Sequence, residues 1–243
     1  SDMAVGLGLM MNIQFPQNFN SPYKSFSITE FWQRWHMTLS AWLKDYLYIS
    51  LGGNRTGQYK TYRNLMLTMV IGGFWHGANW TFIIWGALHG AYLIFGIITQ
   101  NAREKLAQLI GLTRVPRVHQ AIKMMATFIL VTFSWIFFRA NSLSDAMYVV
   151  THLLDFSTTP QLLQAISIKY KTVALLGLSK AEIMLSFGLI LFLQIFYWLQ
   201  ERRGVLAVLS RKPAAVRLAL YYLVVLLTIF LGKFEKAPFI YFQ

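Results

Sequence analysis

His76 is the residue in this sequence whose surroundings point most directly to chemistry. It lies in the stretch from Gly72 to Trp80, within a run from Asn64 to Ala102 that contains no Asp, Glu, Lys or Arg. A run of about 39 residues is too long for one membrane crossing, which needs about 20. We therefore expect the backbone to break at the Gly72–Gly73 pair or at Gly77. An ionisable side chain at such a break, deep in a bilayer, usually faces a cavity and serves a function.

Two other histidines also lie in informative surroundings. His36 belongs to an aromatic-rich amphipathic segment, where a histidine can form part of a site or lie at the membrane interface. His89 lies within Gly86–Ala91, a small-xxx-small pattern that lets another helix approach closely, and we expect it to form an interhelical hydrogen bond. For His76, the alternative to a functional role is a hydrogen-bonded packing residue. No ligand spacing such as H-x-x-x-H and no carboxylate cluster is found, so we predict no metal site.

Composition indicates an integral membrane protein. Hydrophobic residues make up 56% of the 243 and charged residues only 13%, whereas soluble domains carry about 25% charged residues. The net charge of +13 does not predict nucleic-acid binding, because the basic residues fall between apolar segments, as in membrane-protein loops. The absence of cysteine excludes disulfides, zinc–thiolate sites and cysteine nucleophiles. The first eleven residues lack the features of a signal peptide and read as the end of a helix.

A capped amphipathic helix is expected over residues 26–47. Ser27 and Glu30 fit a capping box, with Ser27 as the N-cap. The positions that follow put aromatic and aliphatic side chains on one face at helical spacing, and these are Phe31, Trp32, Trp35, Leu39 and Trp42. Such a helix suits the cytoplasmic surface of a membrane or a groove in a protein.

The apolar segments predict an all-α, multi-pass membrane protein with broken or re-entrant helices, in a single membrane domain over residues 1–243. Asn141–Asp145 predicts the capped start of a short amphipathic helix reaching Leu154, and Arg103–His119 and Ser157–Lys180 are expected to be loops. Basic residues gather before Asn64 and within Arg103–Arg117 and Arg202–Arg217, which places these parts in the cytoplasm. The expected spans are 64–76, 79–100, 121–138, 181–200 and 214–232.

Several sequence blocks, in one order along the chain, resemble the membrane-bound O-acyltransferase family. Within that family the sequence is similar to the C-terminal half of the bacterial alginate O-acetyltransferase branch. The Leu-Gly-Gly-Asn-Arg block favours this branch over the teichoic-acid D-alanylation branch. The blocks are Ser1–Ala4, Ser27–His36, Tyr48–Arg55, Gly73–Trp80, Phe137–Ala140 and Phe239–Phe242.

The resemblance implies a tunnel through the bacterial inner membrane, where a cytoplasmic acyl donor meets an extracytoplasmic acceptor. It implies that His76, of the Trp-His-Gly motif, is the catalytic histidine and that His36, of Arg-Trp-His, is the second active-site histidine. It further implies acetyl-CoA as the donor, no bound cofactor, a polysaccharide as the final acceptor and a periplasmic acetyltransferase as the partner. We predict that His76 takes the proton of the acceptor hydroxyl while His36 or a nearby amide polarises the thioester carbonyl. Without cysteine, direct transfer is the simpler mechanism.

Other residues near these motifs are candidates for the tunnel or for donor binding. Tryptophans could line the tunnel, although an aromatic belt at the membrane interface explains them equally well. Basic residues such as Arg34 could attract donor phosphates, although the positive-inside rule also accounts for them. Asp45 is expected to form a structural ion pair with Arg34 or Lys44. The candidates are Trp32, Arg34, Trp35, Asp45, Trp75, Gly77, Asn79 and Trp80.

Three alternatives remain open from the sequence. The first is transfer of D-alanyl or another acyl group to a cell-envelope polymer. The second is a transporter or channel subunit, which also uses broken helices at mid-membrane, although the spans show no inverted repeat. The third is a non-catalytic scaffold whose aromatic end, Pro238–Gln243, docks a partner.

Overall fold

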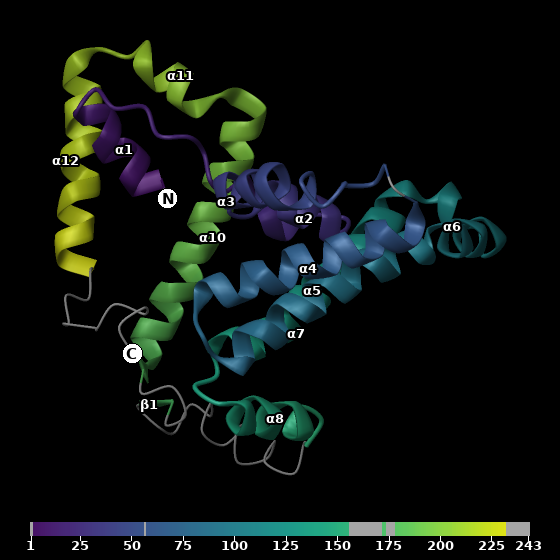
Figure 1. The fold of residues 1–243 in the computed structure, drawn as a ribbon. Coiled ribbons are helices and arrows are strands. Elements are labelled where there is room, and N and C mark those ends of the chain that lie inside the picture. Colours follow the sequence, from purple (N-terminus) through teal and green to yellow (C-terminus); the bar gives the residue numbers. More distant parts are fainter. Residues whose placement is uncertain (1, 56, 156–171, 174–177, 232–243) are drawn as a thin grey trace. The chain divides into compact units, whose positions relative to one another are not determined.

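Helices form almost all of the structure, a computed structural model that describes residues 2–55, 57–155, 172–173 and 178–231 (Figure 1). Apart from turns and extended connections, the other regular structure among these residues is one antiparallel pair of two-residue strands, β1 (Thr172–Val173) and β2 (Leu178–Ser179). The predicted all-α class is therefore confirmed. The chain divides into two units, 1–155 and 156–243, and the site lies in the first. A single membrane domain over the whole chain stays a prediction.

Helices α4 (Gln58–His76) and α5 (Trp80–Ile98) pack side by side as the centre of the first unit (Figure 1). Their backbones approach closely because a Cβ atom on Gly86 would overlap the carbonyl oxygen of Met69, and one on Gly73 would overlap that of Phe82. The prediction that Gly86 lets a second helix approach is confirmed. The expected break at Gly72–Gly73 is wrong: α4 passes through both residues, which serve packing instead, and it ends before Gly77.

Helix α7 (Pro116–Arg139) packs against α5 and completes a three-helix layer with α4 and α5. In the chain between α5 and α7, the helix α6 (Gln100–Leu109) and the short η3 (Leu112–Arg114) occupy most of Arg103–His119, which was expected to be a basic loop. That prediction was wrong because Gln100–Leu109 consists largely of strong helix formers, supported by a bond of 3.1 Å from Gln100 Nε2 to Glu104 Oε1. Basic charge alone did not exclude a helix.

Helix α8 (Leu143–His152) begins as predicted at a capped turn. The Oγ atom of Ser142 accepts a hydrogen bond of 3.1 Å from the backbone N–H of Asp145. This satisfies one of the free N–H groups at the start of the helix. The short amphipathic helix expected from Asn141 onward is confirmed.

The capped helix expected over residues 26–47 is broken into three parts. These are α2 (Ile28–Arg34), α3 (Met37–Trp42) and η2 (Leu43–Tyr48), a π-helical segment. His36 lies at the break in the left-handed region, at φ 44° and ψ 53°. The cause lies in the segment around Asn18 and Asn20, which precedes the short η1 (Pro22–Lys24). This segment forms hydrogen bonds with backbone groups that would bond within a continuous helix. Asn20 N–H donates to the Arg34 carbonyl at 2.9 Å, and Met37 N–H donates to the Asn18 carbonyl at 3.0 Å.

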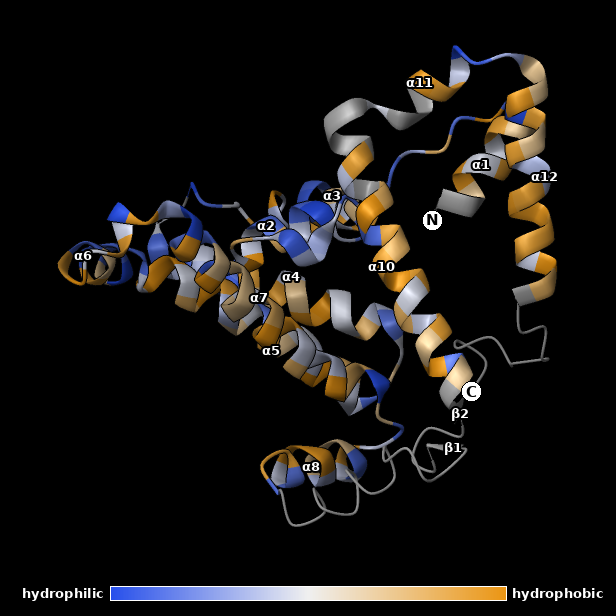
Figure 2. Cartoon of the chain, turned by 180° about the vertical axis from the view of Figure 1, so that it is seen from behind, coloured by the Kyte–Doolittle hydropathy of each residue, from blue (hydrophilic) through white to orange (hydrophobic). Residues whose placement is uncertain are grey.

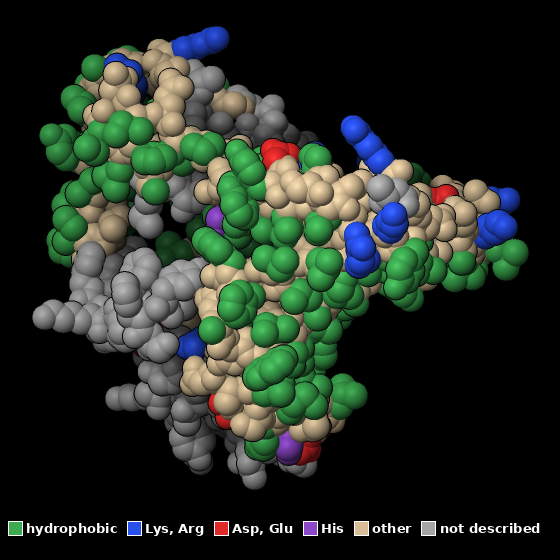
Figure 3. Space-filling model, viewed as in Figure 1, with side chains coloured by type: hydrophobic (Ala, Val, Ile, Leu, Met, Phe, Trp, Pro, Cys, Tyr) green, Lys and Arg blue, Asp and Glu red, His purple; other side chains and the backbone are tan. Residues whose placement is uncertain are grey.

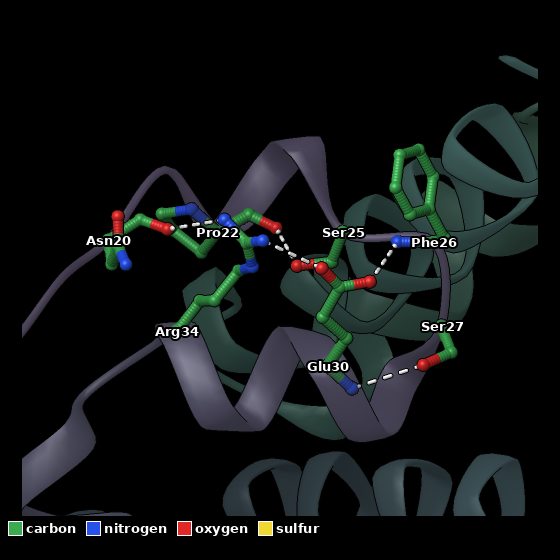
Figure 4. A network of polar contacts seen from close by, with 7 residues as sticks. All are labelled: Asn20, Pro22, Ser25, Phe26, Ser27, Glu30 and Arg34. Atoms are coloured by element: carbon green, nitrogen blue, oxygen red, sulfur yellow. Dashed lines mark hydrogen bonds and ion pairs between the residues drawn. The ribbon is translucent and has the colours of Figure 1, made fainter. Parts of the chain in front are cut away.

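The start of α2 follows the predicted capping box with one difference. Ser27 Oγ accepts from Glu30 N–H at 3.1 Å, whereas the Glu30 carboxylate accepts from Phe26 N–H at 2.8 Å rather than from Ser27 (Figure 4). The same carboxylate forms a 2.8 Å ion pair with Arg34. The expected pairing of Arg34 with Asp45 is wrong, because Glu30 lies one helical turn away on the same face.

Two of the described helices are long and apolar enough to cross a membrane, namely α5 and α7. The expected span 64–76 forms the later part of α4. In the second unit, shorter apolar stretches, Ala181–Phe196 and Ala214–Phe230, lie within α10 (Lys180–Arg203) and α12 (Ala214–Leu231), on either side of α11 (Val205–Ser210) (Figure 2). The short α1 (Asp2–Met10) opens the first unit. Most of the loop expected at 157–180 and the aromatic end 237–243 lie outside the described residues.

Side-chain types divide the visible surface of the first unit in two. Hydrophobic side chains cover much of the face formed by α4 and α5, and Lys and Arg side chains gather toward the α6 end (Figure 3). An apolar face of this kind suits contact with lipid or with other helices.

Candidate functional site

His76 is the last residue of α4, at the break between two packed helices. After Gly77 the chain is extended, and Asn79 caps α5 by accepting a 3.1 Å bond from Thr81 N–H at Oδ1. The other end of the Asn79 amide, Nδ2, donates to the Asn141 carbonyl at 3.2 Å. This single side chain therefore fixes both the start of α5 and the link between the break and the segment that leads into α8.

Aromatic rings surround the His76 imidazole. The ring centroids of Trp75, Phe138 and Trp85 lie 5.0, 5.1 and 5.4 Å from it. Trp85 is only 2% exposed, and all three contacts are edge-to-face, the arrangement that aromatic quadrupoles favour. The Nδ1 atom of His76 is buried and has no hydrogen-bond partner. A buried polar atom without a partner is costly, which suggests that a ligand group completes this site.

His36 is brought into the same region by the break between α2 and α3. Its ring lies 6.2 Å from Phe19 and 6.4 Å from Trp75, measured between centroids. Its Nδ1 atom is also buried without a partner. Burial lowers the pKa of His36 below 6.5, against a smaller opposing effect from a backbone hydrogen bond, so the imidazole is neutral at neutral pH.

The structure therefore brings the two predicted histidines together. Trp75 contacts both imidazole rings, at 6.4 Å from that of His36 and 5.0 Å from that of His76 between centroids. Two imidazoles with unpartnered Nδ1 atoms can accept a proton at one ring and donate a hydrogen bond from the other. This combination is what acyl transfer to a hydroxyl group requires.

An apolar cavity of about 410 Å³ has Met37, the residue that follows His36, in its lining. Its lining residues come from α2, α3, η2, α4 and α5, and Trp32 is one of them. Lys44 and Tyr48 contribute polar groups to a lining that is otherwise mostly hydrophobic. The lining residues are Thr29, Trp32, Gln33, Met37, Ser40, Ala41, Leu43, Lys44, Tyr48, Leu65, Thr68, Met69 and Leu93.

The other candidate residues occupy several different environments. Trp35 is half-buried and stacks on Phe31 at 5.6 Å. Trp75 and Trp80 are 60% and 68% exposed, so their outer faces are open to lipid or to further parts of the protein. Arg34 holds the start of this segment through its ion pair and a 3.3 Å bond to the Asn20 carbonyl. Asp45 is exposed on η2.

A buried network next to the site includes one residue that the sequence did not single out. His89 is fully buried, accepts a bond of 3.2 Å from Trp32 Nε1 and lies 2.8 Å from Ser134 Oγ on α7. The interhelical hydrogen bond predicted for His89 is confirmed. Ser134 was missed, although a hydroxyl in the apolar run of α7 is the kind of signal that marks a contact between membrane helices.

Several known proteins are similar to this chain in sequence. The model of the family described as MBOAT, membrane-bound O-acyltransferase family, matches residues 1–142. The probable alginate O-acetylase AlgI of Pseudomonas aeruginosa is 52% identical over 158 residues, which are 65% of this chain and 28% of that protein. The peptidoglycan O-acetyltransferase of Helicobacter pylori is 49% identical over 156 residues, 64% of this chain and 28% of that protein. The teichoic acid D-alanyltransferase of Streptococcus thermophilus is 37% identical over 101 residues, 39% of this chain and 24% of that protein.

These matches cover less than a third of the length of each relative. Within this chain, however, the family model covers more than half of the residues. The matched part includes His36, His76 and the helices α2, α5 and α7 that carry the buried network. The chain belongs to the membrane-bound O-acyltransferase family.

Proposed function

We propose that this chain forms the histidine site of an O-acyltransferase that moves an acetyl group from a cytoplasmic thioester to an extracytoplasmic hydroxyl acceptor, for the O-acetylation of a polysaccharide. The observation that carries the proposal is the meeting of His36 and His76 at Trp75, each with a buried and unpartnered Nδ1 atom. Relatives named for O-acetylation of alginate and of peptidoglycan support the reaction and the class of acceptor.

In the proposed reaction the His76 imidazole takes the proton of the acceptor hydroxyl as its oxygen attacks the thioester carbonyl. The new oxygen–carbon bond forms, the carbon–sulfur bond breaks, and the imidazolium returns its proton to the departing thiolate. His36, neutral at neutral pH, donates a hydrogen bond to the carbonyl oxygen, where negative charge develops. The chain contains no cysteine that could carry the acyl group in between.

The aromatic rings around His76 give this step a dry environment. Excluding water strengthens the hydrogen bonds to the developing oxyanion and protects the thioester from hydrolysis. Trp85, whose ring contacts that of His76, also has a buried Nε1 atom without an acceptor. We assign it as a further donor that the carbonyl oxygen can use in the transition state.

The site is proposed to lie in a multi-pass protein of the bacterial inner membrane, with acetyl-CoA as the donor on the cytoplasmic side. The apolar helices α5 and α7 and the basic stretches around them support this orientation. A periplasmic acetyltransferase is proposed to pass the group on to the polysaccharide. D-Alanyl transfer is less well supported, because the D-alanyltransferase relative is 37% identical over 101 residues, against 52% over 158 for the alginate relative.

The reaction can be tested in the bacterium that carries this gene. We expect deletion of the gene to remove acetyl esters from one envelope polysaccharide, as measured by mass spectrometry after mild alkaline release. Wild-type protein should restore them and His76→Ala should not, whereas His152→Ala, which alters an exposed histidine of α8, serves as the matched control. Release of D-alanine instead of acetate would assign the alternative reaction, and unchanged esters after deletion would overturn the proposal.

A further inference from the structure

His89 is a fully buried histidine whose hydrogen bonds fix the position of its single ring proton. An indole N–H can only donate, so Nδ1 of His89 accepts from Trp32 Nε1 over 3.2 Å and carries no proton. The hydroxyl proton of Ser134 is given to the Val131 carbonyl at 2.7 Å. Ser134 Oγ must therefore accept from Nε2–H of His89 over 2.8 Å. The ring is the Nε2–H tautomer, with both nitrogens occupied.

His89 differs from the two histidines of the site in the hydrogen-bond partners of its ring nitrogens. Both His36 and His76 keep an Nδ1 atom without a partner, whereas His89 has no lone pair left to receive a proton. His89 is therefore built to hold other groups in place. The group that it holds from α5 is the indole of Trp32 on α2, a residue 57 positions away in the sequence.

Trp32 joins the buried network to the two places where a substrate could lie. Its ring is part of the wall of the apolar cavity of about 410 Å³. It also lies 5.7 Å from the ring of Trp85, which in turn lies 5.4 Å from that of His76. Without His89, the Trp32 N–H would be a buried donor without an acceptor, and the indole would lose the one bond that fixes its orientation.

We propose that His89 is a positioning residue that fixes the indole of Trp32 as a wall of the cavity, and that this wall limits the length of the acyl group the site accepts. The proposal rests on the proposed function, because it takes the cavity as the place of the acyl chain. A cavity lined mostly by apolar side chains suits an aliphatic group better than the phosphates of the donor. Ser134 takes part by orienting the ring of His89 from α7.

Donor selectivity in membranes that hold the full-length protein tests the proposal. We expect His89→Leu to lower the rate with acetyl-CoA, on the order of 100-fold if the wall moves by about 1 Å, and to raise the rate with hexanoyl-CoA relative to acetyl-CoA. Trp32→Phe, which keeps a ring but loses the N–H, should shift the ratio in the same direction. The double variant should be no worse than His89→Leu alone, because the two residues act through one bond.

A matched control exists on α7. Thr127 is buried, and its hydroxyl group donates a hydrogen bond of 3.0 Å to the Lys123 carbonyl of its own helix, as the Ser134 hydroxyl does to the Val131 carbonyl. Among the described hydrogen bonds, Thr127 has none to His89. We expect Ser134→Ala to shift the donor ratio and Thr127→Val to leave it unchanged. Equal shifts in both variants, or independent effects of His89→Leu and Trp32→Phe that simply multiply, would show a general loss of packing and overturn the proposal.

A second measurement does not depend on activity. In protein labelled with ¹⁵N-histidine, NMR should place the proton of His89 on Nε2, and Trp32→Phe should change the Nδ1 resonance of that histidine. A proton on Nδ1, or an unchanged resonance, would overturn the network on which the proposal stands. If the wild-type protein transfers no acyl group from any donor while NMR finds the expected tautomer, the proposed function fails and the role of His89 in holding Trp32 is retained.

Discussion

His36, at the break between α2 and α3, and His76, at the end of α4, converge on the indole of Trp75. The Trp75 ring lies 6.4 Å from that of His36 and 5.0 Å from that of His76. The convergence depends on two backbone breaks, one after α2 and one after α4. The predictions that follow concern the groups that hold these breaks and the chemistry that they make possible.

The first prediction concerns the break at His36. Asn18 Oδ1 accepts from both the backbone N–H of Thr38, at 3.1 Å, and its hydroxyl, at 2.6 Å, and so fixes the start of α3. We expect Asn18→Ala to cost about 1–2 kcal/mol in the free energy of unfolding and to lower the acyl-transfer rate more than this loss explains, because His36 shifts. Gln17→Ala, which removes an exposed amide, is the control. A variant with reduced stability but full activity at low temperature would contradict the prediction.

The second prediction concerns the break after His76. Asn79→Ala removes the cap of α5 and the 3.2 Å bond to the Asn141 carbonyl. Ser142→Ala removes the cap of α8 but leaves that bond in place. Each lost cap should cost about 1 kcal/mol, so thermal unfolding in detergent should move by similar amounts. We expect only Asn79→Ala to reduce the transfer rate strongly, and equal activity losses would show that the link does not position His76.

The third prediction concerns the packing of α4 on α5. An added Cβ at Gly86 overlaps the Met69 backbone, so Gly86→Ala should force the helices apart and cost about 1–3 kcal/mol. Gly96 lies in the same helix with no atom within 4 Å of an added Cβ, and Gly96→Ala should be neutral or slightly stabilising. Unfolding midpoints in the same detergent compare the two. Equal midpoints for the two variants would contradict the close approach.

The fourth prediction concerns pH. Burial lowers the pKa of His36 in the folded protein below 6.5, so as the pH falls below 6.5 the unfolded protein binds the proton more readily than the folded one. The stabilisation is complete above that pH and is lost as the pH falls toward the lowered pKa. We expect the wild-type unfolding temperature to fall between about pH 7 and about pH 5, and that of His36→Asn to fall less. Parallel curves for both proteins would contradict a buried neutral His36.

The sequence allowed several local features to be predicted because their signals are local. The Ser27 and Ser142 caps, the close approach at Gly86 and the end of a helix before Gly77 each depend on residues within a few positions. The break at His36 could not be predicted, because it depends on hydrogen bonds with the chain around Asn18 and Asn20. A regular aromatic period predicts a continuous helix and carries no sign of these tertiary bonds.

In the candidate site, too, the local features could be predicted from the sequence and those that depend on tertiary contacts could not. The motifs around His36 and His76 made both histidines candidates, but their convergence at Trp75 follows only from how the helices pack. The tautomer of His89 depends on Ser134 and Trp32, which belong to two other helices. Hydrogen-bond partners so far apart in sequence leave no periodic signal, and only the packed structure reveals them.

The most direct test of the account measures acyl transfer by the purified full-length protein in lipid nanodiscs, with ¹⁴C-acetyl-CoA as the donor. We predict that His76→Ala lowers transfer to a hydroxyl acceptor by about 100-fold or more, the contribution of a general base, and leaves the unfolding temperature close to that of the wild type. His119→Ala, at the start of α7, should retain full activity. Transfer by a folded His76→Ala protein at the wild-type rate would contradict the assignment of His76 as the base.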